Sequence, residues 1–400
     1  MNDSARAPNR PLNGLLVVAI EQAVAAPFAT RQLADLGARV IKIERPDSGD
    51  FARAYDRTVR GLSSYFVWLN RSKESLTLDI KQAPAREALA RLIERADVVV
   101  QNMGPGAAAR AGLDAATLRA RHPRLIVCTV TGYGATGPYA GKKAYDLLVQ
   151  SEAGVLSITG TQDAPAKVAF SVADIAAGMY AYTAVLTALL RRAQTGAGAT
   201  VEVSLFDALA EWMSQPVYFT KYGGRAPDRS GARHASIAPY GPVATSDGAP
   251  VFLAIQNERE WARFCRDVLA RPELLDDSRF ASNSDRVRHR EELEAIVDAL
   301  LRELPADALV ERLERAGIAC ARMNSVEQLL AHPQLGGRRR WTTVESSAGA
   351  LEVLLPPVTM DGVEPRVDAV PALGEHTARI LAELGFDAAT IAEWRTRGIA

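Results

Sequence analysis

Short apolar runs alternate with amphipathic stretches along the first half of the chain. Residues 15–20 (LLVVAI) predict a buried strand, residues 26–38 a helix, and residues 39–44 (RVIKIE) a second strand. Further strand-like runs follow at residues 75–80, 97–101, 125–131 and 201–205. This alternation is typical of a mostly parallel sheet covered by helices, so the sequence predicts an α/β fold.

A change of composition divides the chain. Residues 221–250 are rich in Gly, Pro, Arg and Ser, as is typical of a crossing between domains. Beyond them, the pattern predicts a smaller α/β unit with strands at residues 250–256 and 318–323 and helices near residues 258–268, 288–302 and 306–316. A Pro-rich extended segment then leads to a terminal helix near residues 375–384. We therefore expect a large domain to begin with residues 1–220, a small domain with its linkers at residues 221–330, and a C-terminal segment at residues 331–400.

The bulk composition narrows the classes of partner. The chain has 400 residues, 48% of them hydrophobic, and it can bury a large core. Lys+Arg and Asp+Glu are equal at 47 each, so the formal charge is zero and no net field attracts nucleic acid or an anionic membrane. We expect neither as a partner, and an anionic ligand has to meet a local patch of charge.

Cysteine usage and the N-terminal sequence predict a cytoplasmic protein. Cys128, Cys265 and Cys320 are widely spaced and lie in apolar or amphipathic stretches, as expected of buried thiols in a reducing compartment. The first fourteen residues have no apolar core of the kind that a signal peptide needs. The most apolar helical stretch, residues 178–190, is too short to span a bilayer.

Several signatures of common chemistry are missing. No G-x-G-x-x-G follows the first strand, where the chain reads EQAVAAPF, and there is no Walker loop and no G-x-S-x-G elbow. The five histidines are scattered and no Cys/His cluster occurs, so we expect no metal site. A nicotinamide oxidoreductase is suggested only by the opening βαβ unit and is opposed by the missing glycine fingerprint.

Asp174 directly precedes a long apolar helix, in the sequence AFSVADIAAGMYAYTAVLTALL. Asp is among the best residues for capping a helix N-terminus, and position alone favours that role. A carboxylate at such a site is also kept anionic by the helix dipole and the free backbone amides, which leaves it available as a nucleophile near neutral pH. The two interpretations are compatible, and both stay open.

Basic residues gather in predicted loops and at the ends of predicted strands. They are Arg71, Lys73, Arg110, Lys142 and Lys143. A solvated surface is the usual explanation of such residues. Open α/β sheets bind their ligands at strand ends, however, so the clustering also favours a cofactor that bears phosphate groups.

The order of these segments resembles the class III CoA-transferase family, which includes the formyl-CoA and carnitine CoA-transferases. The resemblance covers nearly the whole chain and is specific because the segments occur together and in order. They are PLNGLLVVAIEQAVAAPFATRQLADLGARVIKIERPDSGD, LNRSKESLTLDI, QNMGPGAAARAGLD, HPRLIVCTVTGYGATGPY, KKAYDLLVQSEAG, SVADIAAG and RRAQTGAGATVEVSLFDAL.

This resemblance implies a set of functional residues. Asp174 falls on the family's catalytic aspartate, and Gln22 lies with Ala23 in the loop that meets the thioester. Tyr145 is implied to lie close to the acyl group, and His234 is expected to face the substrate. Coenzyme A contacts are implied at Ala23, Arg45, Lys73, Asn102, Met103, Arg110 and Lys143, with Lys142 as the neighbouring alternative to Lys143. The expected ligand is therefore coenzyme A or an acyl-CoA, without a metal.

The same resemblance implies an architecture. The large domain would be Rossmann-like, with a parallel sheet, and would contain both ends of the chain. The middle segment would form the smaller α/β domain. Each chain would form a ring, and two rings would interlock into a homodimer.

The substrate is implied by the same comparison. The N-terminal segment and RHASIAPYGP resemble most the branch that acts on short dicarboxylates such as itaconate, mesaconate or citramalate, with succinyl-CoA as the donor. A second carboxylate needs a cation, for which Arg53, Arg71, Arg233 and His234 are candidates.

Two alternatives to transfer stay open besides the oxidoreductase. A 2-methylacyl-CoA racemase of the same family needs a His-Asp pair, but the chain reads Ala144-Tyr145-Asp146 where racemases have Gly-His-Asp, so the histidine base is missing. A non-catalytic CoA-binding protein would bind coenzyme A without exchanging it between acids.

Overall fold

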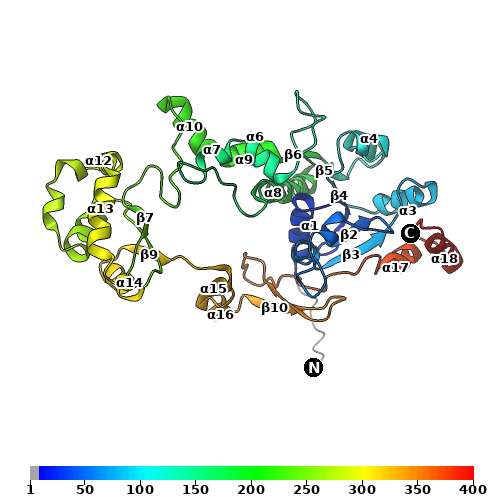
Figure 1. The fold of residues 1–400 in the computed structure, drawn as a ribbon. Coiled ribbons are helices and arrows are strands. Elements are labelled where there is room, and N and C mark those ends of the chain that lie inside the picture. The colour runs from blue at the N-terminus through cyan, green and yellow to red at the C-terminus, as the bar shows by residue number, and fades with distance from the viewer. Residues whose placement is uncertain (1–8) are drawn as a thin grey trace. The chain divides into compact units, whose positions relative to one another are not determined.

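The computed structural model describes residues 9–400, and the chain divides into two compact units (Figure 1). The first unit contains residues up to Gly154 together with Val168–Gln215 and Gly337–Ala400. The second unit contains Val155–Lys167 and Pro216–Gly336. The boundaries between the units lie at residues 215 and 336, close to the expected boundaries at residues 220 and 330. Composition gave no indication that residues 155–167 join the second unit.

A six-stranded parallel sheet forms the centre of the first unit, in the order β3-β2-β1-β4-β5-β6. Its strands are β1 (Leu16–Ile20), β2 (Arg39–Glu44), β3 (Lys73–Thr77), β4 (Val98–Gln101), β5 (Ile126–Thr131) and β6 (Thr200–Ser204). Every strand begins within two residues of its predicted start, so the α/β prediction is confirmed. The order is that of the Rossmann-type doubly wound fold, which reverses direction beside β1 and opens a crevice at the carboxyl ends of β1 and β4.

Alternate residues of the strands face two helical layers, as the period of a strand requires. Val18 and Ile20 join an apolar cluster with α3 (Ala83–Glu94), α5 (Ala115–Arg121), α17 (Thr377–Glu383) and α18 (Ala388–Thr396). The helices α1 (Ala25–Asp35) and α8 (Val172–Thr195) pack on each other and cover the opposite face (Figure 1). Both ends of the chain therefore build this unit.

Helix α8 has 24 residues and extends on both sides of its most apolar stretch, residues 178–190. Among residues 9–400 it alone is long and apolar enough to cross a membrane, so the prediction that it is too short was wrong. It packs against α1, α9 (Leu205–Trp212) and the strands β5 and β6. A core helix passes the same test of length and composition, and these contacts are those of a core helix.

The remaining elements of the first unit lie near the sheet or its edges. A hairpin of β10 (Trp341–Val344) and β11 (Leu351–Leu354), which the sequence did not predict, shares an apolar cluster with Phe66 of α2 (Ser64–Asn70). Short helical segments complete the unit: η1 (Phe51–Ala54), α4 (Ala107–Arg110) and α6 (Asp146–Glu152).

The second unit is the smaller α/β unit that the sequence predicted. It has a three-stranded antiparallel sheet, made of β7 (Tyr240–Val243), β8 (Val251–Ala254) and β9 (Ala319–Arg322). Its apolar core contains Trp261, Phe264 and Phe280. The helical elements are α7 (Val155–Ile158), α10 (Ser214–Gly223), α11 (Glu258–Arg263), η2 (Phe264–Val268), η3 (Pro272–Leu275), η4 (Ser278–Phe280), α12 (Asn283–Arg288), α13 (Arg290–Leu301), α14 (Ala306–Arg315), α15 (Val326–Leu330) and α16 (Pro333–Gly337).

Candidate active site

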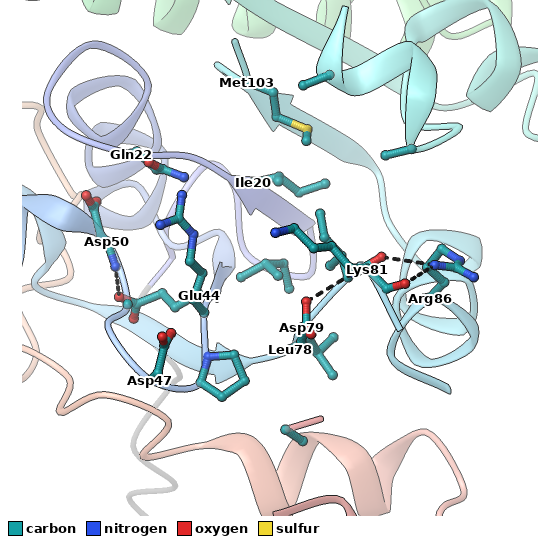
Figure 2. Close-up of a pocket in the computed structure, with 18 of the residues that line it drawn as sticks. Ile20, Gln22, Glu44, Asp47, Asp50, Leu78, Asp79, Lys81, Arg86 and Met103 are labelled. Atoms are coloured by element: carbon teal, nitrogen blue, oxygen red, sulfur yellow. Dashed lines mark hydrogen bonds between the residues drawn. The ribbon is translucent and has the colours of Figure 1, made fainter. Parts of the chain in front are cut away.

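A cavity of about 1190 Å³ opens at the carboxyl ends of β1, β2 and β3 (Figure 2). Its walls come from the residues that follow these strands, including Gln22 after β1, Arg45 after β2 and Lys81 after β3. Met103 follows β4, and Arg395 reaches the cavity from α18. The carboxyl edge of the sheet beside its switch point is where doubly wound folds bind nucleotide-like ligands.

Five cations line this cavity, and they are Arg45, Lys81, Arg86, Arg110 and Arg395. All five are exposed, and within residues 9–400 none of them forms an ion pair with a carboxylate. Asp47 and Asp79 are the cavity carboxylates that also lack a cation within the described chain. The excess of unpaired positive charge suits a ligand with several phosphate groups.

The inner end of the cavity is formed by the turn between β1 and α1. The Gln22 N–H donates to Asn102 Oδ1 (2.9 Å), and Asn102 Nδ2 donates to the Gln22 carbonyl (2.8 Å). The next amide, of Ala23, donates to Asp50 Oδ1 (3.0 Å). These bonds fix the backbone of the turn, while the side-chain amide of Gln22 has no hydrogen bond to any of residues 9–400 and lines the cavity.

Asp174 is the third residue of α8, so the prediction that it caps this helix was wrong. The capping acceptor is Asp146, the first residue of α6. Asp146 Oδ1 accepts the N–H groups of Ala173 (2.8 Å) and Asp174 (3.4 Å), and Oδ2 accepts from Gln150 Nε2 (2.7 Å). Within the described part of the chain, the Asp174 carboxylate has no hydrogen bond and no cation. It is therefore free to react.

The surroundings of Asp174 disfavour its charge. Burial, and then the nearby carboxylate of Asp146, raise the pKa of Asp174 to about 7. In the described chain, no cation or side-chain hydrogen-bond donor opposes this shift. A carboxylate that is poorly solvated and unpaired is a stronger nucleophile than one held in an ion pair, and half of it is ionised near neutral pH.

Two observations bring Asp174 near the inner end of the cavity. Gly178, one helical turn after Asp174, approaches α1 so closely that a Cβ there would lie 2.7 Å from the Ala25 carbonyl oxygen. Ala25 itself begins α1 directly after the Gln22–Ala23 turn. In addition, burial and then the charges of Asp50, Asp174 and Tyr145 raise the pKa of Tyr55 to about 12, so these groups surround Tyr55.

The structure places the residues implied by the family resemblance in several different surroundings. Gln22, Arg45, Met103 and Arg110 line the cavity, whereas Ala23 and Asn102 lie behind it and hold the turn. Tyr145 lies on the Asp174 side. Lys142 pairs with Glu152, but Lys143 is exposed and unpaired among residues 9–400, which favours Lys143 over its neighbour as a ligand contact. His234 lies in the second unit, stacked on Tyr240.

The prediction that Lys73 contacts coenzyme A was wrong. The Lys73 ammonium is buried and contacts Glu21 Oε1 (2.7 Å), Asn70 Oδ1 (3.1 Å) and the Pro27 carbonyl (3.1 Å). Burial lowers the pKa of Lys73 to about 8 in spite of the Glu21 carboxylate. All its donor directions are used inside the protein, so it does not face the cavity as a coenzyme contact.

The sequence did not single out Lys81, Arg86 or Arg395, which line the cavity. Lys81 could have been found, because it follows β3 by four residues and strand ends carry ligand contacts in this fold. Arg395 could not, since only the packing of α18 brings it to the sheet. In the chain from residue 9 onward, no group of His, Cys, Asp and Glu is arranged to hold a metal ion.

A cofactor-sized, cation-lined cavity at the switch point of a doubly wound sheet, with an unpaired carboxylate beside its inner end, defines an α/β enzyme with a phosphate-bearing ligand. The chain belongs to CoA-transferase family III, whose family model matches residues 12–377. It is accordingly a class III CoA-transferase, and acyl-CoA thioesters are its class of substrate. The family predicted from the sequence is confirmed.

Relatives and solved structures match along almost the whole chain. A succinate–glutarate CoA-transferase of Agrobacterium fabrum is 35% identical over 94% of this chain and 97% of that protein. A succinyl-CoA:mesaconate CoA-transferase of Haloarcula hispanica is 30% identical over 95% and 98%. The crystal structure of a CAIB/BAIF family protein from Brucella suis is 34% identical, with a TM-score of 0.82 over 94% of this chain and 100% of that chain.

Proposed function

We propose that this enzyme transfers coenzyme A from succinyl-CoA to a short dicarboxylic acid such as mesaconate, citramalate or itaconate, with Asp174 as the nucleophile. One observation carries the proposal: the Asp174 carboxylate has no hydrogen bond or ion pair within residues 9–400, and its helix packs closely on the start of α1, next to the Gln22–Ala23 turn that lines the cavity. The names of the relatives from Agrobacterium fabrum and Haloarcula hispanica support succinyl-CoA as donor and a dicarboxylate as acceptor.

The proposed reaction proceeds through two activated forms of Asp174. A carboxylate oxygen of Asp174 attacks the thioester carbonyl, the C–S bond breaks, and a mixed anhydride and the CoA thiolate result. The thiolate then attacks the aspartyl carbonyl, which releases succinate with the bridging oxygen and leaves an aspartyl-CoA thioester. The acceptor acid reverses both steps. Since an anhydride and a thioester are both activated acyl groups, no other energy source is required.

Each attack creates a tetrahedral oxyanion that needs a hydrogen-bond donor. The backbone amides of Gln22 and Ala23 are already bound to Asn102 and Asp50. The side-chain amide of Gln22 lines the cavity and has no hydrogen bond to residues 9–400, so we assign the oxyanion to this group.

The coenzyme is proposed to run from Gln22 towards Lys81 and Arg86, which Figure 2 shows on the other side of the cavity. Its phosphate groups would meet these two cations and Arg395, which also lines the cavity. Arg45, Met103 and Arg110 line its path, and Lys143 is proposed to contact it from the Tyr145 side. Lys81 takes the place given to Lys73 by the sequence. Phosphate contacts of this kind contribute mainly to binding.

Replacing Arg395 by Ala is expected to raise the KM for succinyl-CoA by about 5- to 20-fold with little change in kcat, because one charge-assisted contact is lost. Steady-state kinetics against succinyl-CoA measure this. The matched control is Arg397→Ala, since Arg397 is exposed two residues further on, pairs with Glu393 and does not line the cavity. Equal KM values for the two variants would remove Arg395 from the site.

The pH dependence of transfer is expected to report the ionisation of Asp174. Because the nucleophile must be ionised and its pKa is about 7, kcat/KM should fall about tenfold per pH unit below pH 7. Asp146→Asn keeps an oxygen for the α8 amides but removes the neighbouring charge, so its acidic limb should move to lower pH. Comparing the two enzymes on the same substrates cancels substrate ionisation. An unmoved limb would contradict the role of Asp146.

The acid specificity is tested with a panel of carboxylates and succinyl-CoA, read by mass spectrometry of the CoA products. We expect C4 and C5 dicarboxylates to be preferred over oxalate, carnitine and aromatic acids. Three of the cation candidates for the distal carboxylate are already paired in the structure: Arg53 with Glu44, Arg71 with Asp35, and Arg233 with Glu294. The proposal of a dicarboxylate acceptor therefore rests on the names of the relatives and not on these arginines. His234, in the second unit, is the proposed substrate contact.

We further propose that the enzyme works in the cytoplasm as a homodimer of two interlocked rings, as the family resemblance implies. Light scattering after size-exclusion chromatography measures the mass, and a monomer would contradict the dimer.

The racemase alternative is disfavoured because Tyr145 takes the place of the histidine base and Asp146 is occupied in capping α8. Loss of α-deuterium from a 2-methylacyl-CoA would revive it.

A further inference from the structure

Four charged side chains are buried behind the Gln22 end of the cavity, and they are Glu21, Lys42, Asp50 and Lys73. Lys42 Nζ lies 2.8 Å from Asp50 Oδ2 and 3.4 Å from Glu21 Oε1, and Lys73 Nζ lies 2.7 Å from the same Glu21 oxygen. None of the four is more than 3% exposed. Two cations thus balance two carboxylates, and removing one partner alone would leave an uncompensated buried charge.

Asp50 connects this buried cluster to the turn that carries Gln22. Its Oδ1 accepts the N–H groups of Ala23 (3.0 Å) and Ala52 (2.9 Å), while its Oδ2 faces Lys42. Ala23 has a φ of 63°, in the left-handed region that side chains other than glycine rarely adopt. Such a conformation persists only where the surroundings hold it, and here the Ala23 amide is held by Asp50 and the preceding residue by Asn102.

We propose that Asp50 is a positioning residue for CoA transfer. By accepting the Ala23 N–H, Asp50 keeps the side-chain amide of Gln22 directed at the reacting carbonyl. Lys42 binds the other oxygen of Asp50 and so fixes which oxygen faces the turn. Figure 2 places Gln22, Asp50 and Glu44 at the same end of the cavity, and the Asp50 N–H donates to Glu44 Oε1 (3.0 Å). Asp50 acts through Gln22 and not on the substrate. The inference rests on the proposed role of Gln22 in the transfer reaction.

The chemistry of the Asp50–Lys42 contact dictates how to test it. Lysine only donates, so in a single Asp50→Asn variant the amide oxygen has to face Lys42, and the NH₂ group then meets the Ala23 N–H. With Lys42→Met added, the asparagine oxygen is free to accept from Ala23, and Lys73 still balances Glu21. The pair Lys42→Met/Asp50→Asn and Lys42→Met/Asp50→Ala therefore has the same charge and differs in the acceptor for Ala23.

We expect the Asp50→Ala member of this pair to have a kcat about 10- to 100-fold lower than the Asp50→Asn member, because a displaced oxyanion donor loses transition-state contact. The KM for succinyl-CoA should differ by less than about threefold, since ground-state binding lies elsewhere in the cavity. When Gln22→Ala is added to both, the difference in kcat should disappear, as expected of residues that act through one group. Equal kcat values, or a difference that persists without Gln22, would overturn the proposal.

A third variant covers the case in which a double variant does not fold. Ala23→Gly strands no charge and relieves the left-handed strain of the turn, since glycine adopts either sign of φ, so the turn should depend less on Asp50. Added to the single Asp50→Asn variant, whose amide oxygen faces Lys42, Ala23→Gly should recover kcat about three- to tenfold when Gln22 is present and not when Gln22 is alanine; no recovery would count against the proposal. Failure of this inference is separable from failure of the proposed function: transfer by Asp174→Ala would end the function, whereas insensitivity to Asp50 and Ala23 with an inactive Asp174→Ala would end the inference alone.

Discussion

Asp174→Ala is expected to lower CoA transfer between succinyl-CoA and a dicarboxylate by at least about 10³-fold, because the covalent route through the anhydride and the thioester is lost. Binding of coenzyme A should change little, since the cations of the cavity are untouched. Exchange of isotopically labelled succinate into succinyl-CoA measures the loss. A variant that keeps transfer within about tenfold of the parent would exclude a nucleophilic Asp174.

Asp174→Asn is the control that separates the catalytic effect of the carboxylate from an effect on stability. Since the pKa of Asp174 is raised in the folded protein from 3.8 to about 7, its ionisation opposes folding, and this cost is complete above pH 7. The isosteric Asp174→Asn should therefore be at least as stable as the parent at pH 8, while it is as inactive as Asp174→Ala. Thermal unfolding at pH 8 measures the stability, and a lower Tm would show that the carboxylate serves the fold.

Gln22→Ala is expected to lower kcat by about 10²- to 10³-fold, the usual effect of losing one oxyanion donor in a site that excludes water. Gln22→Glu keeps the size of the side chain but removes both N–H donors, so it should be at least as impaired. Steady-state kinetics should show a KM for succinyl-CoA within about threefold of the parent in both variants. If kcat were unchanged and KM rose, Gln22 would contribute equally to binding in the ground state and the transition state, and it would not stabilise the oxyanion.

The sheet could be predicted because its strands depend on local pattern. Val17 to Ile20 and Val98 to Val100 are continuous apolar runs, as buried parallel strands require, and the structure places them side by side in register. The hairpin at Trp341 and Leu351 could not be predicted, because its strands are short and its apolar contacts come from α2, far away in the sequence. Helix α18 was missed for the same reason.

The family resemblance located cavity residues such as Arg45, which directly follows β2, and Arg110, which ends α4. The site was not predictable where side chains from distant segments compete for a partner. The motif that contains Lys73 suggested a ligand contact, yet its ammonium is taken up by Glu21 and Asn70 inside the fold. Similarly, Asp174 has the position of a cap, but Asp146 satisfies the α8 amides from another helix. That tertiary contact leaves Asp174 free for chemistry.

Most carboxylates around the site have structural roles, and Asp174 does not. Asp146 satisfies the start of α8, Asp50 and Glu21 balance buried lysines, and Glu44 pairs with Arg53. Asp174 is left unpaired among residues 9–400 at the point where burial raises its pKa to about 7. Burial without a partner therefore singles out Asp174 as the reactive carboxylate.

The most direct measurement is peptide mass spectrometry of the enzyme after incubation with succinyl-CoA and hydroxylamine in the absence of an acceptor acid. Hydroxylamine converts an aspartyl anhydride or thioester into a hydroxamate, so we expect this modification on the peptide that contains Asp174, and only when succinyl-CoA is present. Rapid transfer activity together with an unmodified Asp174, or a hydroxamate on a different carboxylate, would rule out Asp174 as the nucleophile.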